Sequence, residues 1–186
     1  MDVLEALQDN PIIAAVRDEE GLQKAVGSEV KVVFVLSGTL IDIKETVDLI
    51  RARGKKSLVH LDMIGGLGKE PSAVDFLSQY ANPDGYITTK ISLAKYAKQR
   101  GLFVVQRLFI IDSLSLATGI KGVKDTKPDA IEVMPGIASK LIERLKDQVS
   151  VPIIAGGLIS TKSDIIDTLS TGVLAVATSS PELWNM

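Results

Sequence analysis

The chain has 186 residues, of which 46% are hydrophobic, and it carries a net charge of −2 with a pI of about 5.5. This length suits one domain of ordinary size spanning residues 1–186. The acidic balance excludes a general attraction to nucleic acid, so any RNA contact needs a local basic patch. The absence of cysteine excludes disulfides and thiolate chemistry, and the single histidine, His60, excludes a zinc cluster.

The N-terminus, "MDVLEALQDN", carries acids and lacks a basic, apolar leader, so it does not resemble a secretory signal. No stretch of the chain approaches the ~20 consecutive apolar residues of a membrane span. We therefore expect a cytoplasmic protein with no membrane partner, no metal and no cofactor.

Eight apolar runs rich in β-branched residues follow along the chain and predict eight strands. In order, they cover residues 12–16, 30–36, 57–64, 85–89, 102–110, 130–134, 151–155 and 172–178. Stretches with helical spacing of apolar residues separate them; in residues 41–53, for example, Ile43, Val47 and Ile50 share one face. This alternation predicts a parallel sheet with helical crossovers.

Two architectures fit eight such units, an open doubly wound sheet and a closed barrel. We favour the barrel because it leaves no edge strands, and the usual barrel of about 250 residues implies short loops here. Only "SS" and then "PELWNM" follow the eighth run, so the last outer helix is expected to be truncated. The expected fold is therefore α/β, a compact (β/α)8 TIM barrel with short loops and a truncated final helix.

Function in such barrels gathers at the carboxyl ends of the strands, and the loops after strands 7 and 8 often hold a phosphate. Gly156 and Gly157 follow the seventh run and permit a close approach and a positive φ, while Thr178 and Ser179 end the eighth run with hydroxyl groups. This pairing predicts an anion site. The alternative is that the glycines only turn the chain and a serine caps a short helix.

Other polar residues also lie at expected strand ends. Arg17 follows the first strand, and His60 and Asp62, two residues apart, are expected to point to the same side of the third. Lys90 ends the fourth strand and Glu132 lies in the sixth. If these sides face the barrel interior, the groups converge on a ligand. A structural network explains the same pattern, because buried polar groups must be paired.

Two further motifs give weak signals. The loop "MIGGLGK" (63–69) lacks the GxxxxGK[ST] spacing, which argues against nucleotide binding there. The basic runs 51–56, 97–101 and 121–127 end helices or precede strands, which places them at the opposite end of the barrel. The helix macrodipole alone accounts for such residues, so they are a poor indication of RNA binding.

Seven stretches, in this order, resemble the glycerol-3-phosphate-responsive antiterminators that regulate glycerol uptake operons. They are "NPIIAAVRD", "VHLDMIGGLGKEPSAVDFL", "PDGYITTK", "QRLFIIDS", "PDAIEVMPGI", "PIIAGGLIS" and "ATSSPELW". The resemblance covers nearly the whole chain and implies binding of glycerol 3-phosphate and of leader mRNA, prevention of transcription termination, and no catalysis. It implies a ligand site that contains Arg17, Asp62, Lys90, Glu132, Gly156, Gly157 and Ser179.

Two functions are therefore weighed. The first is a ligand-responsive regulator that holds a phosphate at Gly157 and Ser179 and hydroxyl groups near Asp62 and Glu132. The second is an aldolase- or isomerase-type barrel enzyme acting on a small phosphorylated sugar, with Lys90 as a Schiff-base amine and a carboxylate that moves protons.

The short C-terminus also predicts self-association. Without a final outer helix, Leu183 and Trp184 are expected to stand beside uncovered apolar surface, and two such gaps would cover each other in a homodimer. The alternative is that Trp184 folds back and closes the gap of its own barrel.

Overall fold

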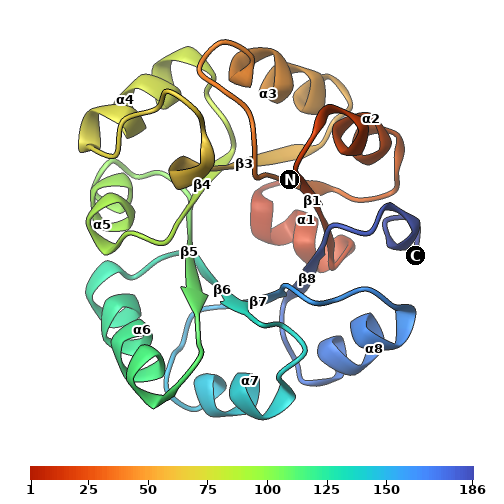
Figure 1. Ribbon diagram of the computed structural model, residues 1–186, viewed down its shortest axis with the longest axis vertical. Helices are drawn as coiled ribbons and strands as arrows, with labels where there is room; N and C mark the ends of the chain where they lie inside the picture. The colour runs from red at the N-terminus through yellow and green to blue at the C-terminus, as the bar shows by residue number, and fades with distance from the viewer.

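The computed structural model describes residues 1–186, and its eight parallel strands close into a barrel in which each strand pairs with the next and β8 pairs with β1 (Figure 1). The strands are β1 (Ile12–Val16), β2 (Val32–Val35), β3 (Lys56–His60), β4 (Gly85–Thr88), β5 (Val104–Phe109), β6 (Ala130–Met134), β7 (Ile153–Gly156) and β8 (Ala175–Thr178). The predicted (β/α)8 barrel is confirmed, and the open-sheet alternative is wrong.

Helices surround this barrel on the outside (Figure 1). They are α2 (Glu19–Gly27), α3 (Ile43–Ala52), α4 (Pro71–Tyr80), α5 (Ile91–Gln99), α6 (Ser113–Thr126), α7 (Ser139–Lys146) and α8 (Lys162–Ser170). After β8 there is only a 3₁₀ turn, η2 (Pro181–Leu183), so the final helix is truncated as predicted. None of the helices combines the length and the apolar character needed to cross a lipid bilayer.

Local sequence accounts for these helices. In α3 the apolar positions Ile43, Val47 and Ile50 are all fully buried against the sheet. Asp112 begins α6 by accepting a hydrogen bond from the backbone N–H of Ser115, and Thr161 caps α8 in the same way. Propensity, caps and apolar spacing therefore agree on where the helices lie.

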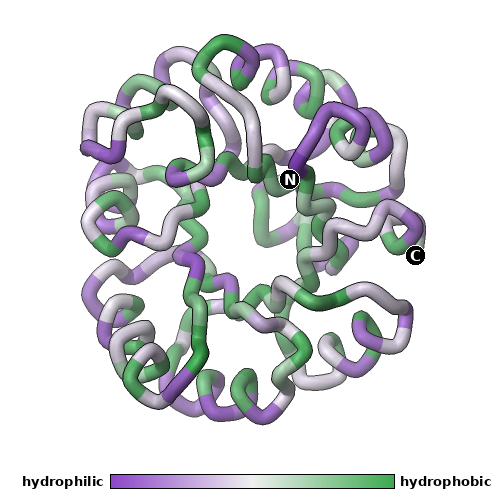
Figure 2. Tube along the Cα trace, viewed as in Figure 1, coloured by the Kyte–Doolittle hydropathy of each residue, from purple (hydrophilic) through white to green (hydrophobic).

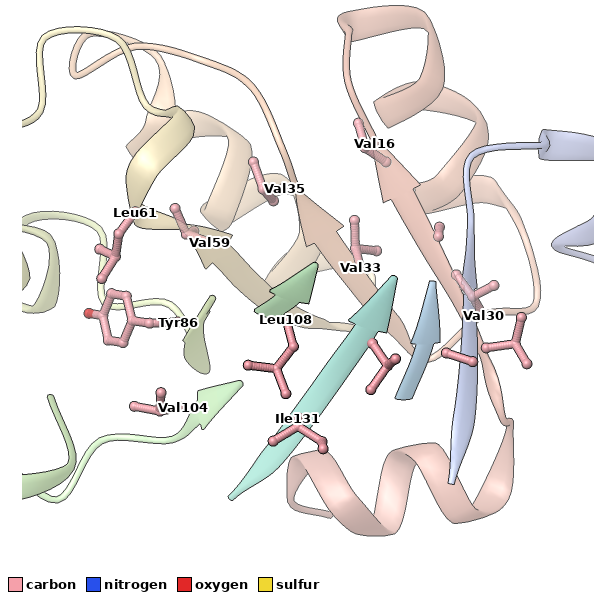
Figure 3. Close-up of a cluster of buried hydrophobic side chains, with 14 of the residues drawn as sticks. Val16, Val30, Val33, Val35, Val59, Leu61, Tyr86, Val104, Leu108 and Ile131 are labelled. Carbon is pink, nitrogen blue, oxygen red and sulfur yellow. The ribbon is translucent and has the colours of Figure 1, made fainter. Parts of the chain in front are cut away.

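The core has two layers because successive side chains of a strand point to opposite sides of the sheet. An outer layer of 39 buried residues lies between the strands and the helices, and Figure 3 shows part of it, including Val33, Val59 and Ile131. An inner layer of 15 residues fills the barrel and contains Phe34 and Leu58. Figure 2 shows the ring of strands as largely hydrophobic and the surrounding helices as alternately hydrophobic and hydrophilic.

An additional helix, α1 (Val3–Asp9), precedes β1 and was not predicted from the sequence. Its apolar residues Val3, Ala6 and Leu7 belong to the inner layer, so α1 closes the end of the barrel where the strands begin. Asp2 and Glu5 form a capping box that fixes the start of this short helix. The barrel interior is therefore closed by apolar side chains at the end where the strands begin.

The C-terminal turn corrects one expectation. Trp184 is 1% exposed, and its indole Nε1–H donates to the carbonyl oxygen of Thr178 at 3.0 Å. Leu183 is also buried. The prediction that these two side chains stand beside uncovered apolar surface is wrong, because the turn closes the gap on its own barrel. The homodimer loses this support and stays a prediction that sedimentation would test.

Candidate functional site

A cavity of about 70 Å³ opens at the carboxyl ends of β7, β8 and β1. Five of the residues predicted to bind a ligand line it, namely Arg17, Glu132, Gly157, Thr178 and Ser179. Arg107 joins them from β5, and the remaining wall is apolar. The structure therefore brings the arginine after β1, the carboxylate of β6 and the two candidate loops around one space.

The β7 loop has the backbone conformation that the glycine pair suggests. Gly157 has a φ of +80°, in the left-handed region that favours glycine, and a Cβ at this position would lie 2.7 Å from the Cε atom of Met134. The backbone N–H groups of Gly157 and Ser179 donate to no other group of the protein. Two donors are thus available at the cavity wall, which suits an anion.

Thr178 lines the cavity as predicted, but its hydroxyl group is also engaged within the protein. Its Oγ1 donates to the carbonyl oxygen of Ile159 at 2.8 Å and accepts from the backbone N–H of Ser180 at 3.2 Å. The hydroxyl group thus joins the loop after β7 to the loop after β8. Thr178 therefore connects the two walls of the cavity, while Ser179 is exposed.

A buried ion pair forms the floor of the cavity. The Nε–H of Arg107 donates to Oε2 of Glu132 at 2.6 Å, and the two side chains are 6% and 2% exposed. Burial raises the pKa of Glu132, although the adjacent guanidinium acts in the opposite direction. The Nη groups of Arg107 form no hydrogen bond within the protein, so the pair presents fixed N–H donors to the cavity.

Gly156 contributes indirectly. A Cβ at this position would overlap the carboxylate of Glu132, whereas the residue itself does not line the cavity. The second glycine of the pair is therefore the one beside the cavity, and the first makes room for the ion pair. The two glycines therefore serve different purposes. Gly157 turns the chain with a positive φ, and Gly156 allows the Glu132 side chain to approach the backbone closely.

His60 and Asp62 lie on the other side of the barrel mouth and do not line this cavity. The strand ends at His60, and Asp62 lies in the 3₁₀ turn η1 (Leu61–Met63), so the expectation that both point from one strand is wrong. Asp62 Oδ2 instead accepts hydrogen bonds at 2.9 Å from Thr88 Oγ1 and from the Thr89 backbone N–H. This is the structural network that was the alternative reading.

The imidazole of His60 is 2% exposed, and its Nδ1 lies 3.6 Å from Asp62 Oδ2 without a hydrogen bond. Burial lowers the pKa of His60 to about 4, with the positive charge of Arg107 as the second cause. His60 is therefore neutral at neutral pH, and its proximity to Asp62 is not an ion pair under those conditions.

Lys90 also lies outside the cavity. It is the residue before α5, its backbone N–H donates to Thr88 Oγ1 at 3.1 Å, and its ammonium group forms no salt bridge. The enzyme hypothesis requires this amine to face a bound sugar phosphate, and Lys90 does not line the cavity.

Comparison with known proteins identifies the chain's relatives. The family model of the glycerol-3-phosphate-responsive antiterminators matches residues 12–184. The chain belongs to this antiterminator family. It is 36% identical over 186 residues to the uncharacterised protein YgcP of Escherichia coli K12, covering 100% of this chain and 97% of that protein.

Two solved structures are similar to this antiterminator-family protein. A glycerol uptake operon antiterminator regulatory protein from Listeria monocytogenes is 33% identical, with 95% of each chain covered and a TM-score of 0.91. An antiterminator-related protein from Thermotoga maritima is 32% identical, with 94% and 98% covered and a TM-score of 0.84. Barrel enzymes such as an epimerase also align, but at 13% identity they show the fold alone.

Within this regulatory family member, Arg107 is the residue at the cavity that sequence reasoning missed. The signal was present, because Arg107 interrupts the apolar run 102–110 at a position two residues after Val105, and alternate residues of a strand share one side. Since Val105 belongs to the inner layer, Arg107 faces the interior as well. A charge at an inward position of a buried strand needs a partner, and Glu132 is that partner.

Proposed function

We propose that this protein is a ligand-responsive transcription antiterminator that binds glycerol 3-phosphate in the cavity at the ends of β7, β8 and β1 and binds the leader mRNA of a glycerol-utilisation operon. Membership of the antiterminator family supports the regulatory role. The similarity to glycerol uptake operon antiterminator proteins from Listeria monocytogenes and Thermotoga maritima supports the link to glycerol uptake.

The observation that carries the ligand part is the set of unpaired donors around one small cavity. Arg17 supplies a guanidinium group, Ser179 a hydroxyl and a backbone N–H, and Gly157 a second backbone N–H. A phosphate dianion satisfies all of these groups, and charge-assisted hydrogen bonds of this kind are the strong ones. The glycerol hydroxyl groups then lie toward the ion pair of Arg107 and Glu132, which both donates and accepts.

Ligand binding regulates only if it favours one conformation over another. The loops after β7 and β8 meet at the hydrogen bond between Thr178 and Ile159, and a phosphate held between them stabilises that arrangement. We infer that the liganded loops favour the RNA-binding state. The expected signature is an RNA affinity that rises when glycerol 3-phosphate is added.

Isothermal calorimetry with glycerol 3-phosphate tests the ligand site. Ser179→Asp places a carboxylate against the phosphate, and because facing like charges costs several kcal/mol, we expect affinity to fall by about a hundredfold. Ser92→Asp, at an exposed position of α5, makes the same change in net charge away from the cavity and serves as the control. Equal affinities for wild type and Ser179→Asp would remove the phosphate from this cavity.

A gel-shift experiment with a leader transcript of a glycerol uptake operon tests the RNA part. The wild type is expected to retard the transcript in the presence of glycerol 3-phosphate and to bind it more weakly with glycerol or inorganic phosphate. Equal retardation of the transcript with and without glycerol 3-phosphate would contradict the proposed regulation, although RNA binding itself would stand.

A further inference from the structure

The charge of the chain is divided unevenly. Residues 90–127 contain eight lysines and arginines but two acids, a net charge of +6, whereas the rest of the chain has 13 basic and 21 acidic residues, a net charge of −8. The positive segment consists of α5, β5 and α6, which are neighbours in the barrel (Figure 1). Three of the eight basic residues, Lys98, Arg100 and Arg107, form ion pairs with acids outside the segment. The five that remain still outnumber the two acids of the segment, so the overall charge of −2 conceals one cationic sector.

In the basic run 51–56, by contrast, most basic side chains form ion pairs or hydrogen bonds within the protein. Lys56 Nζ lies 2.9 Å from Asp84 Oδ1, and Arg51 Nη1 lies 2.8 Å from Asp48 Oδ1. Lys55 Nζ donates to two backbone carbonyl oxygens. The basic run 51–56 therefore stabilises the fold for the most part, and it is a poor candidate for an RNA surface.

The lysines of the outer α5 and α6 surfaces differ in this respect. Lys95, Lys121, Lys124 and Lys127 are exposed and form no salt bridge. Lys95 lies in the middle of α5 and Lys121 lies five residues before the end of α6, so the macrodipole, which acts in the last turn, does not account for them. These cations are available to a partner.

The same sector contains an open groove of about 390 Å³ above β5 and between α5 and α6. Phe109, Ile91 and Leu114 line it, and they are 54%, 39% and 75% exposed. An exposed aromatic ring beside cations is the combination that binds single-stranded nucleic acid, since bases stack on the ring while lysines neutralise phosphates.

The groove and the lysines form one continuous surface. On α5, Ile91 and Lys95 are four residues apart, and on α6, Leu114 and Lys121 are seven apart, so each pair shares a helix face. Seven residues correspond to about 10 Å along the helix axis. A strand whose base enters the groove can therefore pass over the lysines of both helices.

We propose that single-stranded RNA binds along the α5–α6 face, with its phosphates on Lys95, Lys121 and Lys124 and an unstacked base against Phe109. This inference rests on the proposed function and gives its RNA partner a location. Arg107 lines both the groove and the ligand cavity. A ligand that engages this guanidinium therefore contacts a side chain that also lines the groove, and the two sites share one residue.

Fluorescence anisotropy with a labelled, randomised single-stranded RNA of about 20 nucleotides tests the surface, because such a length covers one or more stacking sites. The triple variant Lys95→Gln, Lys121→Gln, Lys124→Gln is expected to bind at least about tenfold more weakly. Its salt dependence, log affinity against log salt, is expected to be shallower by about 2, because each phosphate contact on a single strand contributes about 0.7.

The matched control is Lys69→Gln, Lys140→Gln, Lys162→Gln, which removes three exposed, unpaired lysines elsewhere and changes the net charge equally. It is expected to keep the wild-type salt slope. Equal losses in both triple variants, or no loss in either, would overturn the α5–α6 assignment and leave RNA binding by the protein standing.

Phe109→Ser tests the groove, and at 54% exposure this side chain is not needed for the core. Loss of stacking is expected to weaken RNA binding by about tenfold. A wild type that sediments as a dimer and a Phe109→Ser variant that sediments as a monomer, with unchanged RNA affinity, would assign the groove to a second copy and overturn the proposal.

Calorimetry with glycerol 3-phosphate on the same variants separates this inference from the proposed function. Both lysine variants are expected to bind the ligand as the wild type does. A wild type that binds glycerol 3-phosphate but no RNA under any condition would overturn both the surface and the RNA half of the proposed function, while the ligand half stands.

Discussion

Polar residues lie on both sides of the barrel mouth, but they differ in burial and in the hydrogen bonds that they form. On the β3–β4 side, Asp62 Oδ2 is engaged by Thr88 and Thr89, and His60 is buried and neutral beside it. On the β7–β8–β1 side, Arg17 and Ser179 border a cavity and keep donors without protein partners. Both sides keep some unused hydrogen-bonding capacity, because Nδ1 of His60 and Oδ1 of Asp62 are buried without a partner. The β7–β8–β1 side differs in that its unused groups are N–H and hydroxyl donors bordering a cavity, which is why we place the proposed anion there.

The difference follows from the number of groups each side chain offers. A guanidinium has five N–H donors, and Arg107 uses one of them on Glu132. The remaining donors stay fixed because the ion pair holds the side chain. The Asp62 carboxylate, by contrast, turns its engaged oxygen toward the β4 end and so stabilises the loop itself.

Removal of Glu132 is expected to have the largest effect. Glu132→Ala leaves the charge of Arg107 buried without a partner, and we expect the free energy of unfolding, measured by urea titration, to fall by about 3–5 kcal/mol. The double variant Arg107→Met, Glu132→Leu removes both charges and is expected to recover most of that loss. If the double variant were as unstable as the single one, the ion pair would not be the cause.

His60 provides the test on the other side. Its pKa of about 4 in the folded chain lies below the usual 6.5, so between these pH values the unfolded chain takes up a proton and the folded chain does not. Above pH 6.5 His60 is neutral in both states and does not oppose folding. On acidification to pH 4, protonation of His60 in the unfolded chain is expected to lower the free energy of unfolding by about 3 kcal/mol.

His60→Gln is expected to lack that part of the acid sensitivity. Urea unfolding of both proteins at the two ends of this pH window gives the difference directly. Identical pH dependence in wild type and variant would show that His60 titrates normally and that the β3–β4 side is more open than described.

Two single variants, one on each side of the barrel mouth, compare the contributions of the two sides to ligand binding. Arg17→Ala is expected to weaken glycerol 3-phosphate binding by about 2 kcal/mol, about 30-fold, because a charge-assisted hydrogen bond is lost. Asp62→Asn, on the opposite side, is expected to change the affinity by less than about 0.5 kcal/mol. Calorimetry measures both, and a larger loss in Asp62→Asn would reverse the assignment of the two sides.

Lys90 is expected to have the smallest effect. Because its ammonium group lies outside the cavity, Lys90→Met is expected to change ligand affinity by about 0.5 kcal/mol or less. Borohydride treatment with a triose phosphate, followed by mass spectrometry, is expected to give no adduct at Lys90. A trapped adduct that disappears in the variant would favour the enzyme hypothesis instead.

The sequence predicted the barrel because parallel strands buried on both faces are long apolar runs, and these are easily recognised. It misplaced Asp62 because the run 57–64 stays apolar beyond His60, where the chain turns into η1 without a glycine or proline to signal the end. It missed α1 because seven residues give too little periodicity.

The site was predicted in part for related reasons. Gly157 and Ser179 follow their strands directly, so their location needed only the barrel topology. The roles of Gly156 and Arg107 depend on contacts with Glu132, which comes from a different strand. Spacing along one strand carries no information about such a contact, and the same limit explains why the burial of Trp184 was not foreseen.

The burial of Trp184 also makes the protein its own optical probe. It is the only tryptophan of the chain, so the intrinsic indole emission comes from one place. Its ring lines a hollow shared with Arg17 and Ser179, and its Nε1–H is bonded to Thr178 at the end of β8. A phosphate that arrives at Ser179 changes the electric field at this indole, and the resulting shift in emission reports occupancy of the cavity without any added label.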